Sequence, residues 1–323
     1  MTRWQFVALL GAAAVWPFAA RAQQPLLPRV GVIFQGGPWE AVIDGLREGL
    51  NQLGFVEGKQ FVLNIRNTHG DLKAVEEAAK DLEQQKVDVI YTAATSVSLA
   101  TKRVTVNTPI VFVAGTDPVA VQLVESIRRP GGRLTGMHIP VTYVTGKRLE
   151  LLREIVPNLH RVVTFYNPHN PSAIEFAKEA QEAARRLGLQ LIERHVASVE
   201  ELKKTLQAFG AGEADAYFAA SDAMLDTEAR YIIDMAKAKR LHTMFYLQGV
   251  VEEGGLASYS PDFKEAGRLS ATYVRRILAG TNPGDLPVEQ SDRLVFLINL
   301  KTAKEIGLPI PESILVRADK VIE

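Results

Sequence analysis

Small polar side chains follow several apolar runs of this chain, in two series that resemble each other. Thr95 and Ser96 stand after one such run in the first half, and Ser221 and Asp222 stand after another in the second half. Hydroxyl groups at the start of a helix, together with free backbone N–H groups, can bind a carboxylate, and an aspartate can hold an ammonium group. Helix capping is the ordinary alternative for these residue types. The positions indicate binding chemistry for a small charged or zwitterionic molecule.

The other candidates come from the rule that doubly wound sheets bind ligands outside the carboxyl ends of their strands. Trp39 and Tyr259 stand beside expected strand ends and could hold an apolar or aromatic ligand between them, with ordinary packing as the alternative. Asp117 could also hold an ammonium group, although we favour a helix cap there. The candidate ligand-binding residues are Gln35, Gly36, Trp39, Thr95, Ser96, Thr116, Asp117, Asn167, Ser172, Ser221, Asp222 and Tyr259.

The sequence lacks the patterns of enzymes and nucleotide-binding proteins. Neither G-x-S-x-G nor H-E-x-x-H occurs, and the six histidines are scattered without the spacing of metal ligands. Gly36 and Gly37 resemble a phosphate cradle only weakly, because no G-x-G-x-x-G or G-x-x-x-x-G-K-[ST] motif is present. Asp222 and Asp226 lie one helical turn apart, where they favour a helix N-terminus rather than an acid–base pair. We expect no enzymatic activity, no catalytic residue, no metal and no cofactor.

The N-terminal segment 1–22 has the features of a secretory signal peptide. Arg3 precedes an apolar run at 6–14, and Ala20-Arg21-Ala22 fits a cleavage site. The run is too short to span a bilayer, and no later segment comes closer. The chain has no cysteine, which excludes disulfides, thiol nucleophiles and a lipid anchor on cysteine. We expect an exported, periplasmic protein that is not embedded in the membrane.

The charge of the chain is balanced, with 37 basic and 37 acidic residues. The basic residues are spread among carboxylates, as expected of solvated helix faces. A nucleic acid is therefore not an expected partner.

Apolar runs alternate with helical patterns along the chain, which is typical of βαβ units and mainly parallel sheets. The expected strands are 29–34, 61–66, 88–93, 109–114 and 134–139, then 161–166, 190–196, 215–220, 242–247 and 255–260. The expected helices are 39–53, 72–85, 96–105, 143–155, 171–187, 199–209, 226–239 and 262–279, followed by two short strands and a helix near 300–306.

The two halves repeat one another. Arg29-Val-Gly-Val-Ile-Phe-Gln35 is answered by Arg161-Val-Val-Thr-Phe-Tyr-Asn167, and each opens a helical stretch that closes at a Leu-Gly pair. We expect an α/β fold of two doubly wound, parallel-sheet lobes joined by a hinge of several segments. The expected division is a signal peptide at 1–22, a first lobe at 23–140 plus 262–292, and a second lobe at 141–261 plus 293–323.

Several short phrases are similar to those of a known family. They include Leu53-Gly-Phe-Val-Glu-Gly58, Gly115-Thr-Asp-Pro-Val119, Lys147-Arg-Leu-Glu-Leu-Leu152 and Ile298-Asn-Leu-Lys-Thr-Ala-Lys304. Together they resemble the periplasmic substrate-binding proteins of ABC transporters, in an uncharacterised family related to tryptophan-binding-protein-like receptors. The similarity covers nearly everything from residue 29 to residue 323.

This resemblance implies a type 1 periplasmic-binding fold that captures a small molecule between its lobes. It implies an amino acid, especially an aromatic one, or a related carboxylate as the ligand, and an ABC permease with its ATPase as transient partners of a monomeric receptor. Ser96 stands where the family often has proline, and Ser260 stands where glycine is common. Because both flank the expected cleft, we expect a pocket of different shape and polarity.

Two other function classes stay open on the sequence alone. An exported ligand-sensing input protein for a signalling partner would have the same fold. A hydrolase or lyase with an unrecognised site is the third hypothesis.

Overall fold

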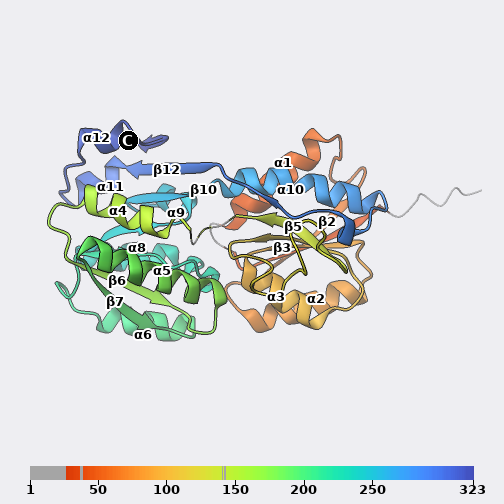
Figure 1. Ribbon diagram of the computed structural model, residues 1–323, viewed down its shortest axis with the longest axis horizontal. Coiled ribbons are helices and arrows are strands. Elements are labelled where there is room, and N and C mark those ends of the chain that lie inside the picture. The colour runs from red at the N-terminus through yellow and green to blue at the C-terminus, as the bar shows by residue number, and fades with distance from the viewer. Residues whose placement is uncertain (1–26, 37–38, 140, 142) are drawn as a thin grey trace, which may run out of the picture.

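The computed structural model describes residues 27–36, 39–139, 141 and 143–323. The expected signal peptide and Gly37 lie outside these residues. The chain forms two α/β lobes that lie side by side along the long axis of the molecule (Figure 1). Among the residues the structure describes, no helix has the length and apolar character needed to cross a bilayer.

The first lobe contains a six-stranded sheet in the order β11-β5-β4-β3-β1-β2, in which every pair is parallel. Both β3 and β4 are buried along their whole length, as expected for apolar strands that are covered on two faces. The strands are β1 (Arg29–Phe34), β2 (Val62–Asn67), β3 (Val89–Ala93), β4 (Ile110–Ala114), β5 (Leu134–His138) and β11 (Glu289–Gln290). The covering helices are α1 (Glu40–Gln52), α2 (Leu72–Gln84), α3 (Thr95–Val104) and α10 (Phe263–Leu278).

The second lobe contains a seven-stranded sheet in the order β13-β12-β10-β9-β8-β6-β7. Its strands are β6 (Arg161–Tyr166), β7 (Gln190–His195), β8 (Ala216–Phe218), β9 (His242–Phe245), β10 (Ala257–Pro261), β12 (Leu294–Asn299) and β13 (Lys320–Ile322). Its helices are α4 (Thr145–Ile155), α5 (Pro171–Leu187), α6 (Val199–Ala208), α7 (Ala223–Asp226), α8 (Ala229–Ala238), α9 (Gln248–Glu252), α11 (Leu300–Glu305) and α12 (Glu312–Leu315).

The internal repeat of the sequence appears in the topology. The first lobe contains the order β2-β1-β3-β4-β5, and the second contains β7-β6-β8-β9-β10. The strand order therefore reverses between β1 and β3 and again between β6 and β8, and ligands bind at such switch points in doubly wound sheets. The expected α/β fold of two mainly parallel sheets is confirmed.

Some elements differ from the expectation. The helix expected at 226–239 is two helices, α7 and α8, and β12 is antiparallel to β10. The short helices α9 and α12 and the strand β13 were not expected. A one-turn helix is too short to show hydrophobic periodicity, so the sequence pattern does not reveal it.

The chain passes from one lobe to the other three times: between β5 and α4, at the junction of β10 and α10, and at residues 291–293. Hydrogen bonds tie neighbouring crossings together, since the Ser291 N–H donates to the His138 carbonyl (3.0 Å) and the Asp262 N–H donates to the Arg293 carbonyl (2.8 Å). The expected lobe boundaries near residues 140, 262 and 292 stay a prediction.

Helices α1 and α10 pack with their backbones in close contact, although they are far apart in the sequence. A Cβ atom on Gly45 would lie 2.0 Å from the Lys264 carbonyl oxygen, and one on Gly267 would lie 2.0 Å from the Val42 carbonyl oxygen. Glycine is therefore required at both positions. The contact fastens α10, which follows a crossing segment, to the first helix of the first lobe.

Candidate ligand-binding site

A cavity of about 520 Å³ lies between the two lobes. The first lobe lines it with Gln35, the turn 69–73 and Ser96, and the second lobe lines it with Asn167, Asn170 and Asp222. A larger groove of about 820 Å³ lies within the first lobe, between residues 102–107 and 119–134. We place the candidate site in the smaller cavity, because it lies at the switch points of both sheets.

Five helices begin at this cavity: α2, α3, α5, α6 and α7. Side chains at the cavity cap four of them, since Asp71, Asn170, Ser198 and Asp222 each accept a backbone N–H of the helix that follows. Helix N-termini carry partial positive charge. The carboxylates of Asp71 and Asp222 already occupy two of these N-termini.

Helix α3 is the exception, because no side chain among the described residues caps it. Ala94 precedes it with φ 96° and ψ 147°, a conformation that residues with a Cβ rarely adopt. An uncapped helix start leaves backbone N–H donors for an external partner. The hydroxyl of Ser96, in the first turn of α3, lines the same cavity.

Thr95 has a structural role in this arrangement. Its hydroxyl oxygen is buried and accepts the N–H groups of Gly115 (3.0 Å) and Thr116 (3.2 Å). The side chain thus fixes the loop after β4 against α3. Thr116 continues the connection across the cleft, where its hydroxyl lies 2.5 Å from the hydroxyl of Ser172 in the second lobe.

The carboxylate of Asp222 is fully buried and already has partners within the chain. It accepts the N–H groups of Asn167 (2.8 Å) and Met224 (3.1 Å), and the side chain of Asn170 and the N–H of Leu225 also donate to it. Burial raises the pKa of Asp222, and these donors oppose that shift. Asp222 therefore positions the ends of β6 and β8 at the cavity.

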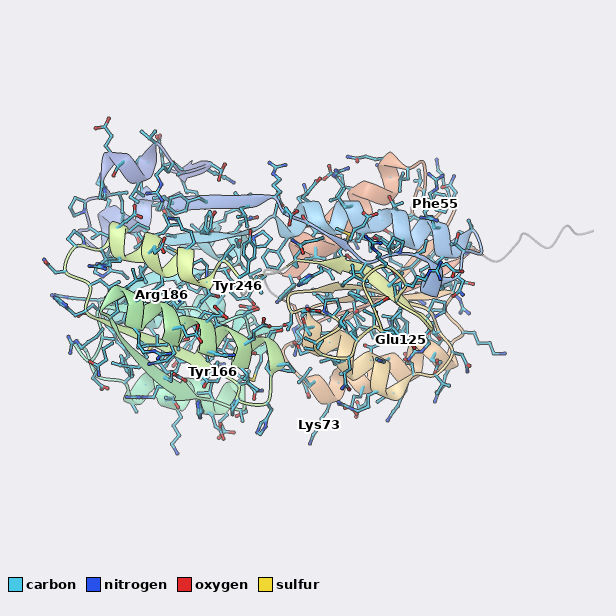
Figure 2. All side chains as sticks on the ribbon, in the orientation of Figure 1. Phe55, Lys73, Glu125, Tyr166, Arg186 and Tyr246 are labelled. Carbon is cyan, nitrogen blue, oxygen red and sulfur yellow. The ribbon has the colours of Figure 1, made fainter. Side chains whose placement is uncertain are left out.

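A second buried carboxylate connects the lobes. Asp226 accepts the indole N–H of Trp39 (2.9 Å) from the first lobe and the hydroxyl of Tyr246 from the second. The ring of Phe263 packs edge-on against Trp39 (5.2 Å between centroids) and against Tyr246 (6.0 Å). Figure 2 shows Tyr246 on the side of the second lobe that faces the first. Burial raises the pKa of Asp226 well above its ordinary value.

Arg148 contacts the Tyr246 ring of this cluster and is also buried. It donates to the Ala219 carbonyl (3.0 Å), and its guanidinium carbon lies 4.7 Å from the centre of the Phe218 ring and 5.7 Å from that of Tyr246. Burial lowers the pKa of Arg148 to about 9. The sequence analysis missed both Arg148 and Tyr246 as cleft-supporting residues. The position of Arg148 on the face of α4 that carries Leu149 and Leu152 is the signal that was available.

The structure distributes the predicted site residues over several positions. Gln35, Ser96, Asn167 and Asp222 line the main cavity, and Trp39, Thr95, Ser96, Ser172 and Ser221 line an adjoining void of about 10 Å³. Such a void holds no more than a single water molecule. The lobes are therefore closed on each other along this part of the cleft.

The remaining predicted residues have other surroundings. Asp117 caps a turn by accepting the N–H groups of Val119 (2.8 Å) and Ala120 (3.2 Å). A Cβ on Gly36, which has φ 88°, would lie 2.6 Å from the side-chain oxygen of Asn67. Tyr259 packs edge-on against Phe296 (6.1 Å), whereas Trp39 packs on Phe263, so a ligand held between the two rings stays a prediction.

The described residues contain no group of three or more His, Cys, Asp or Glu side chains that could hold a metal ion.

Residues 29–322 match the model of a family described as ABC transporter substrate binding protein. The chain belongs to this family. The resemblance found in the sequence is thereby confirmed, and family members are solute-binding proteins.

Individual relatives agree with this assignment. The chain is 23% identical over 264 residues to the tyrosine-binding protein of Clostridioides difficile, covering 82% of this chain and 76% of that protein. It is similar to a crystal structure of an ABC domain in complex with L-Trp from Streptococcus pneumonia, with a TM-score of 0.83, 25% identity and coverage of 92% and 100% of the two chains. A conserved domain protein from Vibrio cholerae gives a TM-score of 0.84, 27% identity and the same coverage.

Proposed function

We propose that this member of the family is a periplasmic receptor that captures an amino acid or a related small carboxylate between its lobes. In this proposal the closed form delivers the ligand to an ABC permease with its ATPase. The observation that carries the proposal is the cavity itself, which both lobes line and at which the uncapped start of α3 leaves donors for a carboxylate.

The relatives and the energetics support the same ligand class. One relative is named for tyrosine binding, and a similar structure was solved with L-Trp. Charge-assisted hydrogen bonds contribute roughly 1.5–3 kcal/mol each, and burial of an apolar side chain adds about 25 cal/mol per Å². A small zwitterion can therefore reach micromolar affinity, about −8 kcal/mol.

In this proposal the receptor binds its ligand without any chemical step. The receptor is a monomer and is exported by means of its N-terminal segment. A ligand that touches both lobes stabilises the closed form more than the open form. That difference is what a permease would recognise.

Thermal unfolding of the mature protein with each of the twenty L-amino acids tests the proposal. We expect at least one amino acid to raise the melting temperature, because a ligand that binds only the folded state stabilises it. Ser96→Asp should abolish this shift, since it places a carboxylate where the ligand's carboxylate binds. Ser313→Asp, at an exposed position in α12, is the matched control and should keep the shift. An absence of any shift in the wild-type protein would defeat the proposal.

A further inference from the structure

Gln35 lines the cavity and has a buried, unpaired side-chain amide. The residue follows β1 and is only 1% exposed, and neither its side-chain nitrogen nor its side-chain oxygen has a hydrogen-bond partner among the described residues. Its backbone carbonyl accepts the Gly70 N–H (3.1 Å), which fixes the main chain at this point. A buried amide normally has partners, so the free donor and acceptor call for an explanation.

The acidic side chains of the cavity are less suited to hold an ammonium group. Asp222 already accepts hydrogen bonds from four groups of its own chain, which is about the capacity of a carboxylate. Asp71 is exposed at the cavity mouth, and one of its oxygens accepts the N–H groups of Lys73 and Ala74. An exposed carboxylate interacts weakly with a charged group because water screens it.

Gln35 lies one strand away from the uncapped start of α3. Strand β1 lies next to β3, and the residues that follow β3 form the uncapped start of α3 with Ser96. Neighbouring strands are about 4.8 Å apart. A carboxylate bound at Ser96 therefore places the adjacent carbon and its amino group near Gln35.

We infer that Gln35 recognises the α-amino group of the ligand, and that the cleft selects α-amino acids over carboxylic acids of the same size that lack this group. The side-chain oxygen accepts a hydrogen bond from the ammonium group, and the side-chain nitrogen donates to the neighbouring carboxylate. This inference rests on the proposed function. It replaces Asp222 with Gln35 as the partner of the ammonium group.

The energetic reason is the cost of an unpaired amide in a closed cleft. An acid without the amino group leaves the buried oxygen of Gln35 without a donor, and sites built around a hydrogen bond reject analogues that lack it. We expect a preference of roughly tenfold or more for the amino acid.

Calorimetric titration tests the inference with the twenty L-amino acids and with the acids in which hydrogen replaces each amino group. Wild-type protein should bind an amino acid at least about tenfold more tightly than its counterpart. Gln35→Met, which keeps the length of the side chain and removes both polar atoms, should reduce this ratio about tenfold, because only the amino acid has an ammonium group that loses its acceptor. Gln207→Met, at an exposed position, should leave the ratio unchanged.

The remaining outcomes separate the two proposals. A ratio that survives in Gln35→Met, or that is lost instead in Asp222→Asn or Asp71→Asn, overturns the inference. Equal binding of both acids by the wild-type protein also overturns it and leaves the proposed function standing, whereas no binding of any acid defeats both. The unliganded melting temperature of Gln35→Met should not fall, because the amide has no partner to lose; a large fall would contradict the role.

Discussion

Ala94 stands immediately before α3 in a backbone conformation that glycine adopts far more readily. Its φ of 96° and ψ of 147° bring the start of the helix to the cleft. For a residue with a Cβ, such a conformation costs of order 1–3 kcal/mol, and it persists only where the surrounding structure enforces it. The main-chain geometry at the candidate carboxylate site is therefore held under strain.

Replacing this alanine with glycine should relieve the strain. We expect Ala94→Gly to raise the free energy of unfolding by about 1 kcal/mol, because the gain exceeds the extra entropy of glycine in the unfolded chain. Urea denaturation measures the change. Ala100→Gly, the same substitution inside α3, should lower stability by about 1 kcal/mol. A loss of stability in both variants would show that Ala94 is not strained.

The helix pair α1 and α10 has so little space between its backbones that a single methyl group should separate the helices. Gly267→Ala would bring its Cβ within 2.0 Å of the Val42 carbonyl oxygen, an atom that cannot rotate away. We expect a loss of about 3 kcal/mol or more in the free energy of unfolding. Gly146→Ala is the matched control, since the nearest atom to its Cβ is the end of the Arg186 side chain at 3.4 Å. That variant should be neutral or slightly stabilising.

His138 lies at the end of β5, next to a segment that crosses between the lobes, and its protonation should make the stability of the protein depend on pH. Burial lowers the pKa of His138 below its ordinary value of 6.5, and the nearby Asp117 and Asp292 only partly oppose this effect. The unfolded chain therefore binds a proton at a higher pH than the folded chain does, so stability should fall as pH drops below about 6.5. His138→Gln should flatten this part of a plot of unfolding free energy against pH. A steeper decline in the variant would contradict the assignment.

At the scale of elements, periodicity and apolar runs were sufficient to place the main strands and long helices. The strand-end rule also selected Gln35, Ser96, Asn167 and Asp222, which line the cavity. The strand-end rule did not reveal the hydrogen-bond partners of these side chains. The partners of Asp222, for example, depend on the exact ends of two strands. The pair Trp39 and Asp226, 187 residues apart, has no local signal at all.

The whole molecule is closed by contacts between the lobes, and the bond from Trp39 to Asp226 is the one that a single substitution can remove most cleanly. Trp39→Phe keeps an aromatic ring against Phe263 and deletes the N–H donor. We expect the unliganded protein to open, seen as a larger radius of gyration in solution scattering, and ligand affinity to fall several-fold because closure becomes less favourable.

Tyr246→Phe is the control for that experiment. It also removes a donor from Asp226, but from within the second lobe, so it should lower stability without opening the cleft. Equal radii of gyration for the wild-type protein and Trp39→Phe would show that the bond from Trp39 to Asp226 does not hold the lobes together. Trp39 is the only tryptophan after the expected signal peptide, so its fluorescence should also report ligand binding in the wild-type protein.

The packing of α1 against α10 also has a consequence for how the protein is made. The first lobe begins with β1 at Arg29, yet its core is incomplete until Phe263–Leu278 has left the ribosome. Contacts between residues so distant in sequence slow folding, because a long loop must close before they form. The nascent first lobe should therefore stay loose through most of translation, while the uninterrupted stretch from β6 to β10 can begin to assemble ahead of it.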